Sequence, residues 1–266
     1  MSRTGLLQKM RTTWTAPDRS VEYELRLDET LTPLNALVGT KIELAFTGKM
    51  RCVACGREIK KTFQQGYCFP CTQRLAETDL CIVKPELCHH HKGTCRDNDF
   101  ATRHCFITHV VYLAVSSGAK VGVTREHQKI TRWADQGASA AIELVRVPSR
   151  LEAGLVEVEL AKHLSDKTNW RKLLTAAAPS VDLLALKSSL KNKIPDAFKT
   201  ALSPHDEITR LTYPVQAYPT KINSYNFDKN PILEDKLIGI KGQYLIFQNG
   251  VINVRKFQGY EIEFSA

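Results

Sequence analysis

The sequence predicts an α+β protein in which two inserted modules separate N- and C-terminal β-segments that share one sheet or small barrel. Apolar and polar residues alternate near both ends, all cysteines lie between Cys52 and Cys105, and strand and helix patterns alternate after them. We therefore divide the chain into four parts. These are an N-terminal β-segment (1–50), cysteine-rich metal-binding modules (51–108), an α/β unit (109–176), and a helical linker with a C-terminal β-segment (177–266).

The two terminal segments are expected to be β-structure because their apolar residues recur at every second position. VEYELRL (21–27) and KIELAF (41–46) show this alternation near the start, and YEIEF (260–264) shows it near the end. A period of two is typical of strands that are buried on one face. The dipeptide Asn249-Gly250 between two apolar runs indicates a tight hairpin.

The composition favours a globular protein with an acidic partner. The 266 residues carry a formal net charge of +9, and 43% are hydrophobic, a share typical of folded chains. A basic balance favours nucleic acid or another anionic surface. No stretch approaches the about 20 apolar residues of a membrane span, and the N-terminus lacks the apolar run of a signal peptide. We expect a cytoplasmic protein without membrane contact, in which cysteines bind metal rather than form disulfides.

The first four cysteines form a two-knuckle zinc pattern. CVAC (52–55) and CFPC (68–71) are separated by twelve residues. Two Cys-x-x-Cys turns bring four thiolates to tetrahedral positions, which a structural zinc ion prefers. The expected zinc ligands are Cys52, Cys55, Cys68 and Cys71.

The remaining four cysteines are spaced more widely and leave two kinds of metal site open. They are separated by six, six and nine residues, and no Cys-x-x-Cys knuckle is present. A second structural zinc is one interpretation, and a four-cysteine iron–sulfur cluster is the other. The expected ligands are Cys81, Cys88, Cys95 and Cys105, and His89, His90, His91 or His104 could replace one of them.

Residues 109 to 176 read as strand, strand, helix, strand and helix. The apolar runs of the strands are HVVYLAV (109–115), KVGVT (120–124) and IELVRV (142–147), and the helices include ITRWAD (130–135) and RLEAGLVEVELAKHL (150–164). Polar side chains occur along this unit in the order Tyr112, Lys120, Arg132, Glu157 and Asn169. Through this order, residues 109 to 171 resemble the GIY-YIG nuclease superfamily.

In that superfamily two strands end in signature triplets, and an arginine, a metal-binding glutamate and an asparagine follow. Val110-Val111-Tyr112 stands at the first triplet, which lacks its glycine, and Lys120-Val121-Gly122 stands at the second, with lysine where tyrosine is usual. The resemblance implies an endonuclease that depends on Mg²⁺ or Mn²⁺ bound at Glu157, with catalytic residues Tyr112, Lys120, Arg132, Glu157 and Asn169. The whole layout also resembles an uncharacterised bacterial family of unknown function whose cysteine clusters precede such a hairpin.

The residue chemistry can be argued separately from the resemblance. Tyr112 could act as a general base only if nearby cations lower its pKa from about 10. Arg132 could fork onto phosphate oxygens, and Glu157 could hold a magnesium ion. We favour Glu157 over Glu159 because its neighbours at three and four residues on the helix are small or apolar, so its carboxylate should face protein or a cleft.

The leading hypothesis is a zinc-stabilised protein that binds DNA or RNA and cleaves it with a divalent metal. Two alternatives stay open, a non-catalytic nucleic-acid-binding module and a zinc-scaffolded adaptor for another protein. Binding near the site is expected to use Arg132, Arg150, Arg171 and Lys172. A helical stretch broken at Pro195 presents either a solvated or a phosphate-contacting face, with Lys187, Lys191, Lys193 and Lys199.

Overall fold

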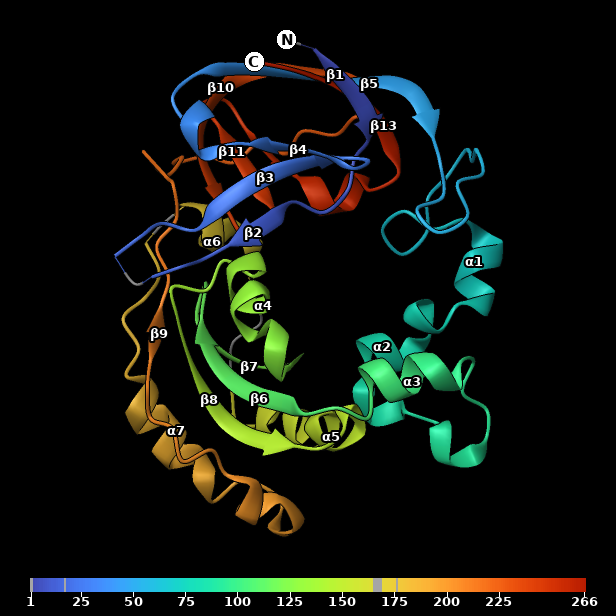
Figure 1. The fold of residues 1–266 in the computed structure, drawn as a ribbon. Coiled ribbons are helices and arrows are strands. Elements are labelled where there is room, and N and C mark those ends of the chain that lie inside the picture. The colour runs from blue at the N-terminus through green and yellow to red at the C-terminus, as the bar shows by residue number, and fades with distance from the viewer. Residues whose placement is uncertain (1, 17, 165–168, 176) are drawn as a thin grey trace.

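The largest sheet of the computed structural model joins both ends of the chain. The structure describes residues 2–16, 18–164, 169–175 and 177–266. The strand order is β1-β13-β5-β10-β11-β12, and the two termini lie side by side at its outer face (Figure 1). The two terminal segments therefore share one sheet, as predicted. Among the described residues this sheet is open, and it does not close into a barrel. Its strands are β1 (Arg3–Leu6), β5 (Lys41–Met50), β10 (Ile232–Lys241), β11 (Tyr244–Phe247), β12 (Val251–Asn253) and β13 (Tyr260–Ser265).

A second, three-stranded sheet packs against the first and encloses the main core. It consists of β2 (Arg11–Thr13), β3 (Glu22–Leu27) and β4 (Thr30–Pro33). Tyr23 and Leu25 on β3 share one apolar cluster with Ile262 and Phe264 on β13. The predicted alternation therefore holds because each terminal strand turns one face inward between the two sheets. The predicted turn at Asn249-Gly250 joins β11 to β12, which pair antiparallel.

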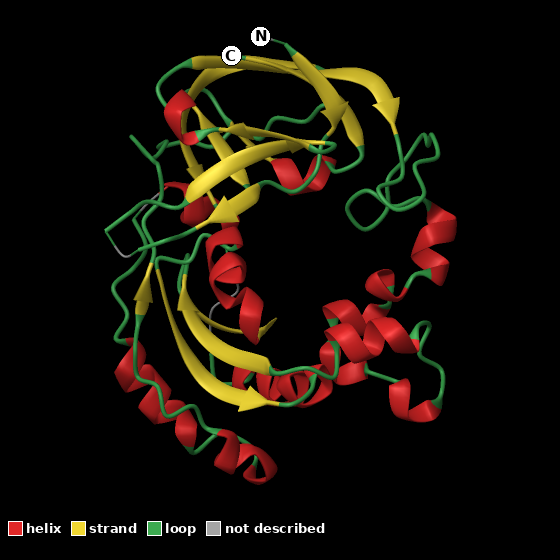
Figure 2. Ribbon diagram, in the orientation of Figure 1, coloured by secondary structure: helices red, strands yellow, loops and turns green. Residues whose placement is uncertain are grey.

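The cysteine-rich region consists mainly of short helices and loops (Figure 2). It lies beside the sheets and connects β5 to the α/β unit (Figure 1). Its helical turns are α1 (Phe69–Arg74), η2 (Ala76–Thr78), α2 (Leu80–Val83), η3 (Pro85–Leu87), η4 (His90–Lys92) and α3 (Asn98–His104). A small apolar cluster there gathers around the first cysteines, with Ile59, Tyr67 and Leu75 at its edge.

The third sheet carries the residues of the α/β unit, in the order β7-β6-β8-β9. Helix α4 covers one face, where Trp133 packs with Tyr112, and α5 covers the other, where Val156 packs with Val111. The predicted order of strand, strand, helix, strand and helix is present. The elements are β6 (His109–Val115), β7 (Ala119–Arg125), η5 (Glu126–Gln128), α4 (Lys129–Asp135), β8 (Ala140–Val147), α5 (Arg150–Ala161) and β9 (Thr209–Arg210).

The linker to the C-terminal strands confirms the break at Pro195 but corrects the interpretation of its lysines. Lys187 is only 1% exposed. Its Nζ donates hydrogen bonds to the carbonyl oxygens of Ser203 (3.1 Å) and His205 (2.7 Å) and pairs with Asp206. Lys187 therefore belongs to neither a solvated nor a phosphate-contacting face. The helices are α6 (Trp170–Thr175), α7 (Leu183–Lys191) and η6 (Asp196–Ala201), with η1 (Asn35–Leu37) and η7 (Val254–Phe257) elsewhere.

Two further expectations concern a domain boundary and membrane-spanning helices. The predicted boundary at residue 176 lies outside the described residues. Throughout the described ranges, none of the helices combines the length and apolar character that crossing a bilayer requires.

Candidate functional site

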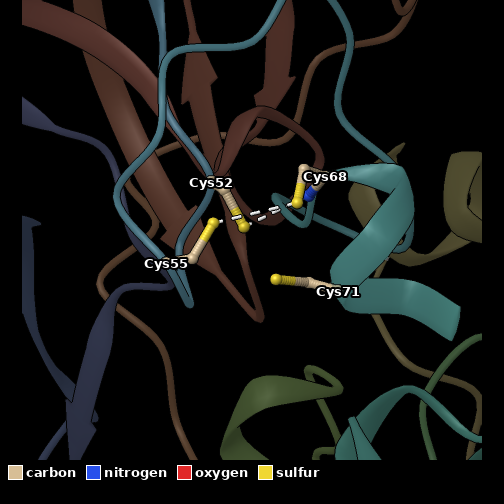
Figure 3. A group of neighbouring side chains, drawn as sticks. All are labelled: Cys52, Cys55, Cys68 and Cys71. Atoms are coloured by element: carbon tan, nitrogen blue, oxygen red, sulfur yellow. Dashed lines mark hydrogen bonds between the residues drawn. The ribbon is translucent and has the colours of Figure 1, made fainter. Parts of the chain in front are cut away.

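The first cysteine group converges on one point, as predicted. The four sulfur atoms lie within 4.8 Å of one another, two from the loop after β5 and two from the start of α1 (Figure 3). Sγ of Cys55 and Sγ of Cys68 are 3.8 Å apart, and a tetrahedral zinc ion with Zn–S bonds of about 2.3 Å requires about 3.8 Å. Burial acts to raise the pKa of Cys52, but backbone N–H groups donating to its sulfur outweigh it and lower this pKa to about 6. The group therefore suits a metal that binds thiolates.

The side chains of the second cysteine group also lie around one cavity, although they are farther apart. All four predicted ligands, Cys81, Cys88, Cys95 and Cys105, line one small cavity between α2, η4 and α3. The ligand atoms that lie within 4.8 Å of one another are instead those of Asp79, Cys81 and His89.

Four of the five residues predicted as catalytic gather around the edge strand β7. Tyr112 on β6 pairs with Gly122 on β7, and Ala114 pairs with Lys120. Directly paired residues project from the same face of a sheet, so Tyr112 and Lys120 share a face. A Cβ atom at Gly122 would lie 2.6 Å from the Tyr112 hydroxyl, and glycine therefore gives the phenol its room.

Tyr112 is buried and stays protonated at neutral pH. Its hydroxyl donates a 2.9 Å hydrogen bond to Oε1 of Gln136, the residue that follows α4. Burial raises the pKa of Tyr112, and the opposing effect of the Arg132 guanidinium is smaller. The condition under which this tyrosine could act as a general base, a pKa lowered by nearby cations, is therefore not met.

Glu157 on α5 lines a cavity of about 280 Å³ together with Lys120 and a second carboxylate, Glu86. Burial raises the pKa of Glu157, Arg132 and Arg150 act to lower it, and Glu86 raises it further. Glu159 instead forms an ion pair with Lys162 at the surface. The preference for Glu157 as the enclosed carboxylate thus agrees with the structure.

Glu86 was not predicted, because its position depends on a contact between distant segments. It lies in η3, inside the cysteine-rich region, and η3 packs on α5 at Gly154. A Cβ atom at Gly154 would lie 2.6 Å from Cβ of Pro85 and 2.7 Å from the backbone nitrogen of Glu86. The small residue one turn before Glu157 is therefore what lets the second carboxylate approach.

A neighbouring cavity of about 330 Å³ has five cationic side chains in its lining. They come from four segments far apart in the sequence and are Lys9, Arg125, Arg132, Arg150 and Arg255. Asp135 is the acid among the lining residues, and Lys9, Gln243 and Thr12 already engage its carboxylate. Within the described residues, the buried Nε atoms of Arg132 and Arg150 have no hydrogen-bond partner.

Burial also lowers the pKa of Arg125, Arg150 and Arg255, and the charge of Arg132 lowers the pKa of Arg150 and Arg255 further. Arg132 and Arg150 were predicted from the sequence as binding residues, whereas Lys9, Arg125 and Arg255 were not. The other two predicted binding residues lie outside the cavity lining, and one of them, Arg171, stacks on the Trp170 ring at 4.5 Å.

Asn169 serves α6 rather than the cavities. Its side-chain oxygen accepts hydrogen bonds from the backbone N–H groups of Arg171 (3.0 Å) and Lys172 (3.3 Å). Its own N–H donates to Oγ of Ser117 in the turn between β6 and β7. The observed role of this residue is that of a helix N-cap.

A buried ion network on β8 fixes α4 beside Tyr112. The Glu143 carboxylate, opposite Tyr112 in the sheet, binds Lys129 at the start of α4 and Nε of Arg146 at 2.7 Å. Burial acts to raise the pKa of Glu143, but these two cations outweigh it and lower this pKa to about 2.

We expect Glu143→Gln to lower the free energy of unfolding by about 3 kcal/mol at pH 7, because it leaves two partly buried cations without their anion. The folded-state pKa lies below the unfolded value, so the contribution is complete above pH 4.5 and disappears as the pH falls toward 2. Urea unfolding should show that the difference in free energy of unfolding between wild type and variant becomes smaller from pH 7 to pH 3. Glu159→Gln, at a half-exposed position on the surface, is the control. A difference in the free energy of unfolding that does not change with pH would contradict the assignment.

The family model described as "Protein of unknown function (DUF2797)" matches residues 39–262. This range includes both cysteine groups, the α/β unit and most of the C-terminal strands. No curated protein and no solved structure gives a significant match.

Proposed function

The chain belongs to the DUF2797 family, which carries no assigned activity, and we propose that it is a nucleic-acid-binding protein that cleaves phosphodiester bonds with a divalent metal. The proposal rests on the juxtaposition of two cavities, one rich in arginine and one holding two carboxylates. The first suits the phosphate backbone of a substrate, and the second suits a hard cation.

The arginine-rich cavity is the observation that carries the binding part. Guanidinium groups donate planar pairs of hydrogen bonds that match phosphate oxygens, and four of them here share one acid that is already engaged. Arg255 also lines a larger groove of about 620 Å³, in which it is joined by Lys60, Lys61 and Lys256. A polyanion lying across Arg255 could therefore contact cations from the first cysteine module to α4.

The carboxylate cavity supports the catalytic part. Glu157 and Glu86 would hold a divalent cation, which supplies neutralisation of charge on the phosphate and activation of water. Lys120 on the same wall suits stabilisation of the leaving oxygen. Since Tyr112 stays protonated, its role in this proposal is to position Gln136 and the edge strand. The GIY-YIG resemblance adds support through the order of these residues and of the elements that carry them.

We further propose zinc as the metal of the first cysteine group, because zinc favours four thiolates in tetrahedral geometry. All eight cysteines are free of disulfides, and thiolate–metal sites of this kind suit the reducing cytoplasm.

The burial of Tyr112 favours a second candidate, a module that binds nucleic acid without cleaving it. In this case the arginine-rich cavity would keep its role, and the carboxylates would be structural. A nicking assay with supercoiled plasmid and with labelled RNA, with and without Mg²⁺ or Mn²⁺, distinguishes the two candidates. Metal-dependent product supports the nuclease, and binding without product supports the module.

Salt dependence tests the binding itself. If four arginines each neutralise one phosphate, affinity for duplex DNA should fall about 100-fold between 50 and 200 mM salt, because each contact releases counterions. Arg255→Gln should reduce the slope of log K against log salt by about one. The control is Arg103→Gln, since Arg103 is exposed and lines none of the described cavities. An affinity insensitive to salt would contradict both candidates.

A further inference from the structure

We infer that the second cysteine group binds an iron–sulfur cluster rather than a single zinc ion. The inference does not depend on the proposed function. The segment that holds these cysteines, residues 79 to 105, contains four short helical turns. Leu80, Val83 and Leu87 in these turns are exposed, and the buried apolar residues there are the small Pro85, Ala101 and Cys105. A segment with so little apolar burial needs another source of stability, which a bound metal provides.

The spacing of the sulfur atoms separates the two metal types. Around one zinc ion the thiolates stand about 3.8 Å apart, and the first group satisfies this requirement with all four ligand atoms within 4.8 Å. In the second group the four cysteines line one cavity, yet no three of these described sulfur atoms lie within 4.8 Å of one another. An iron–sulfur cluster places several iron and sulfide atoms between its cysteines, so it requires this wider ring.

The cysteines reach the cavity from separate elements, which allows such a ring. Cys81 lies in α2, Cys88 follows η3, Cys95 lies in a loop and Cys105 ends α3. No two of them share a tight Cys-x-x-Cys turn that would hold their sulfur atoms close together.

The compact alternative, a zinc ion on Asp79, Cys81 and His89, is disfavoured by the bonds that Asp79 already makes. Its carboxylate accepts the backbone N–H of Cys81 at 3.3 Å as the cap of α2. It also pairs with Nε of Arg96 at 2.7 Å and faces Nε2 of His89 at 3.4 Å. These contacts give the aspartate a structural role as cap and ion-pair partner.

The charges around the cavity suit an anionic cluster. Arg150 is partly buried, and its backbone N–H donates to the carbonyl oxygen of Cys105 at 2.8 Å. Its guanidinium donates to the carbonyl oxygen of Ile82, and it lies close enough to Cys105 and Cys81 to interact with their sulfur atoms when these are thiolates. Four thiolates around an iron–sulfur core retain net negative charge, which would balance this guanidinium.

The test is the metal content of the full-length protein purified without oxygen. We expect a visible absorption band from sulfur-to-iron charge transfer. We also expect iron and acid-labile sulfide in equal amounts, together with one equivalent of zinc. Cys81→Ser should lose iron and sulfide but keep zinc, whereas Cys55→Ser should lose zinc but keep iron and sulfide. Two zinc equivalents without sulfide, or zinc retained at Asp79 and His89, would overturn the inference. So would the absence of any metal beyond the first site. Nucleic-acid binding is a separate readout, so its failure would leave this result unaffected.

Discussion

Glu157→Gln should lower the rate of metal-dependent cleavage by about 100- to 1,000-fold, the loss that follows removal of one charge-stabilising group. The amide keeps the size of the side chain but removes the negative charge that would hold the cation. Substrate affinity should hold or increase, because a negative charge disappears next to the arginine-rich cavity. Single-turnover cleavage at saturating protein, together with equilibrium binding, separates the two effects.

Two further variants make the assignment specific. Glu86→Gln should cause a smaller loss that high Mg²⁺ partly restores, because Glu157 remains to hold the cation. Glu159→Gln, on the same helix but paired with Lys162 at the surface, should leave the rate unchanged. If Glu157→Gln cleaves as fast as wild type while binding persists, the hydrolytic site lies elsewhere, or the observed nicking comes from a contaminant.

The terminal strands and the first cysteine group could be predicted because their signals are local. In β3, Tyr23, Leu25 and Leu27 alternate with polar residues, and one face of this strand is all that the core uses. The two Cys-x-x-Cys knuckles likewise hold their sulfur atoms through backbone geometry within a few residues. In both cases the spacing of a few residues along the sequence is enough to predict the local structure.

The sequence around Lys187 contains a local signal of burial, but this lysine was predicted to lie on the helix surface. Leu183, Lys187 and Leu190 are spaced by four and three residues, so they share one helix face, and all three are buried. The number of lysines suggested a solvated helix face, whereas the spacing of Lys187 relative to Leu183 and Leu190 indicates that its side chain is buried. Tyr112 is a similar case, since the unbroken apolar run of β6 indicates a strand covered on both faces.

Glu86, Lys9 and Arg255 could not be predicted, because their placement depends on packing between segments far apart in the chain. Glu86 approaches Glu157 through the contact between η3 and Gly154, and nothing within η3 encodes that partner. Lys9 and Arg255 meet Arg132 only after the two terminal segments have joined in one sheet. A cavity assembled in this way leaves no periodic pattern in the sequence.

Cys68→Ser should release the metal of the first cysteine group and unfold residues 51–75 while the two packed sheets stay folded. Metal binding contributes about 10–16 kcal/mol to small zinc modules, whereas the few apolar side chains around these cysteines contribute only about 5 kcal/mol. Hydrogen exchange followed by mass spectrometry should show lost protection in residues 51–75 and retained protection in β3 and β13. Cys81→Ser, which alters the other cysteine group, should leave residues 51–75 protected.

Unfolding of residues 51–75 should also disturb the groove that Arg255 and Lys60 line, because one hydrogen bond connects Arg255 to this segment. Nε of Arg255 donates to Oε1 of Gln65 at 2.6 Å, and Gln65 lies in the loop between the two knuckles. When this loop unfolds, Arg255 loses its anchor and Lys60 and Lys61 leave the groove. Cys68→Ser should therefore weaken nucleic-acid binding more than Arg255→Gln does, because three cations are displaced instead of one. If Cys68→Ser keeps both its zinc and its protection, the four cysteines do not form the metal centre that stabilises this module.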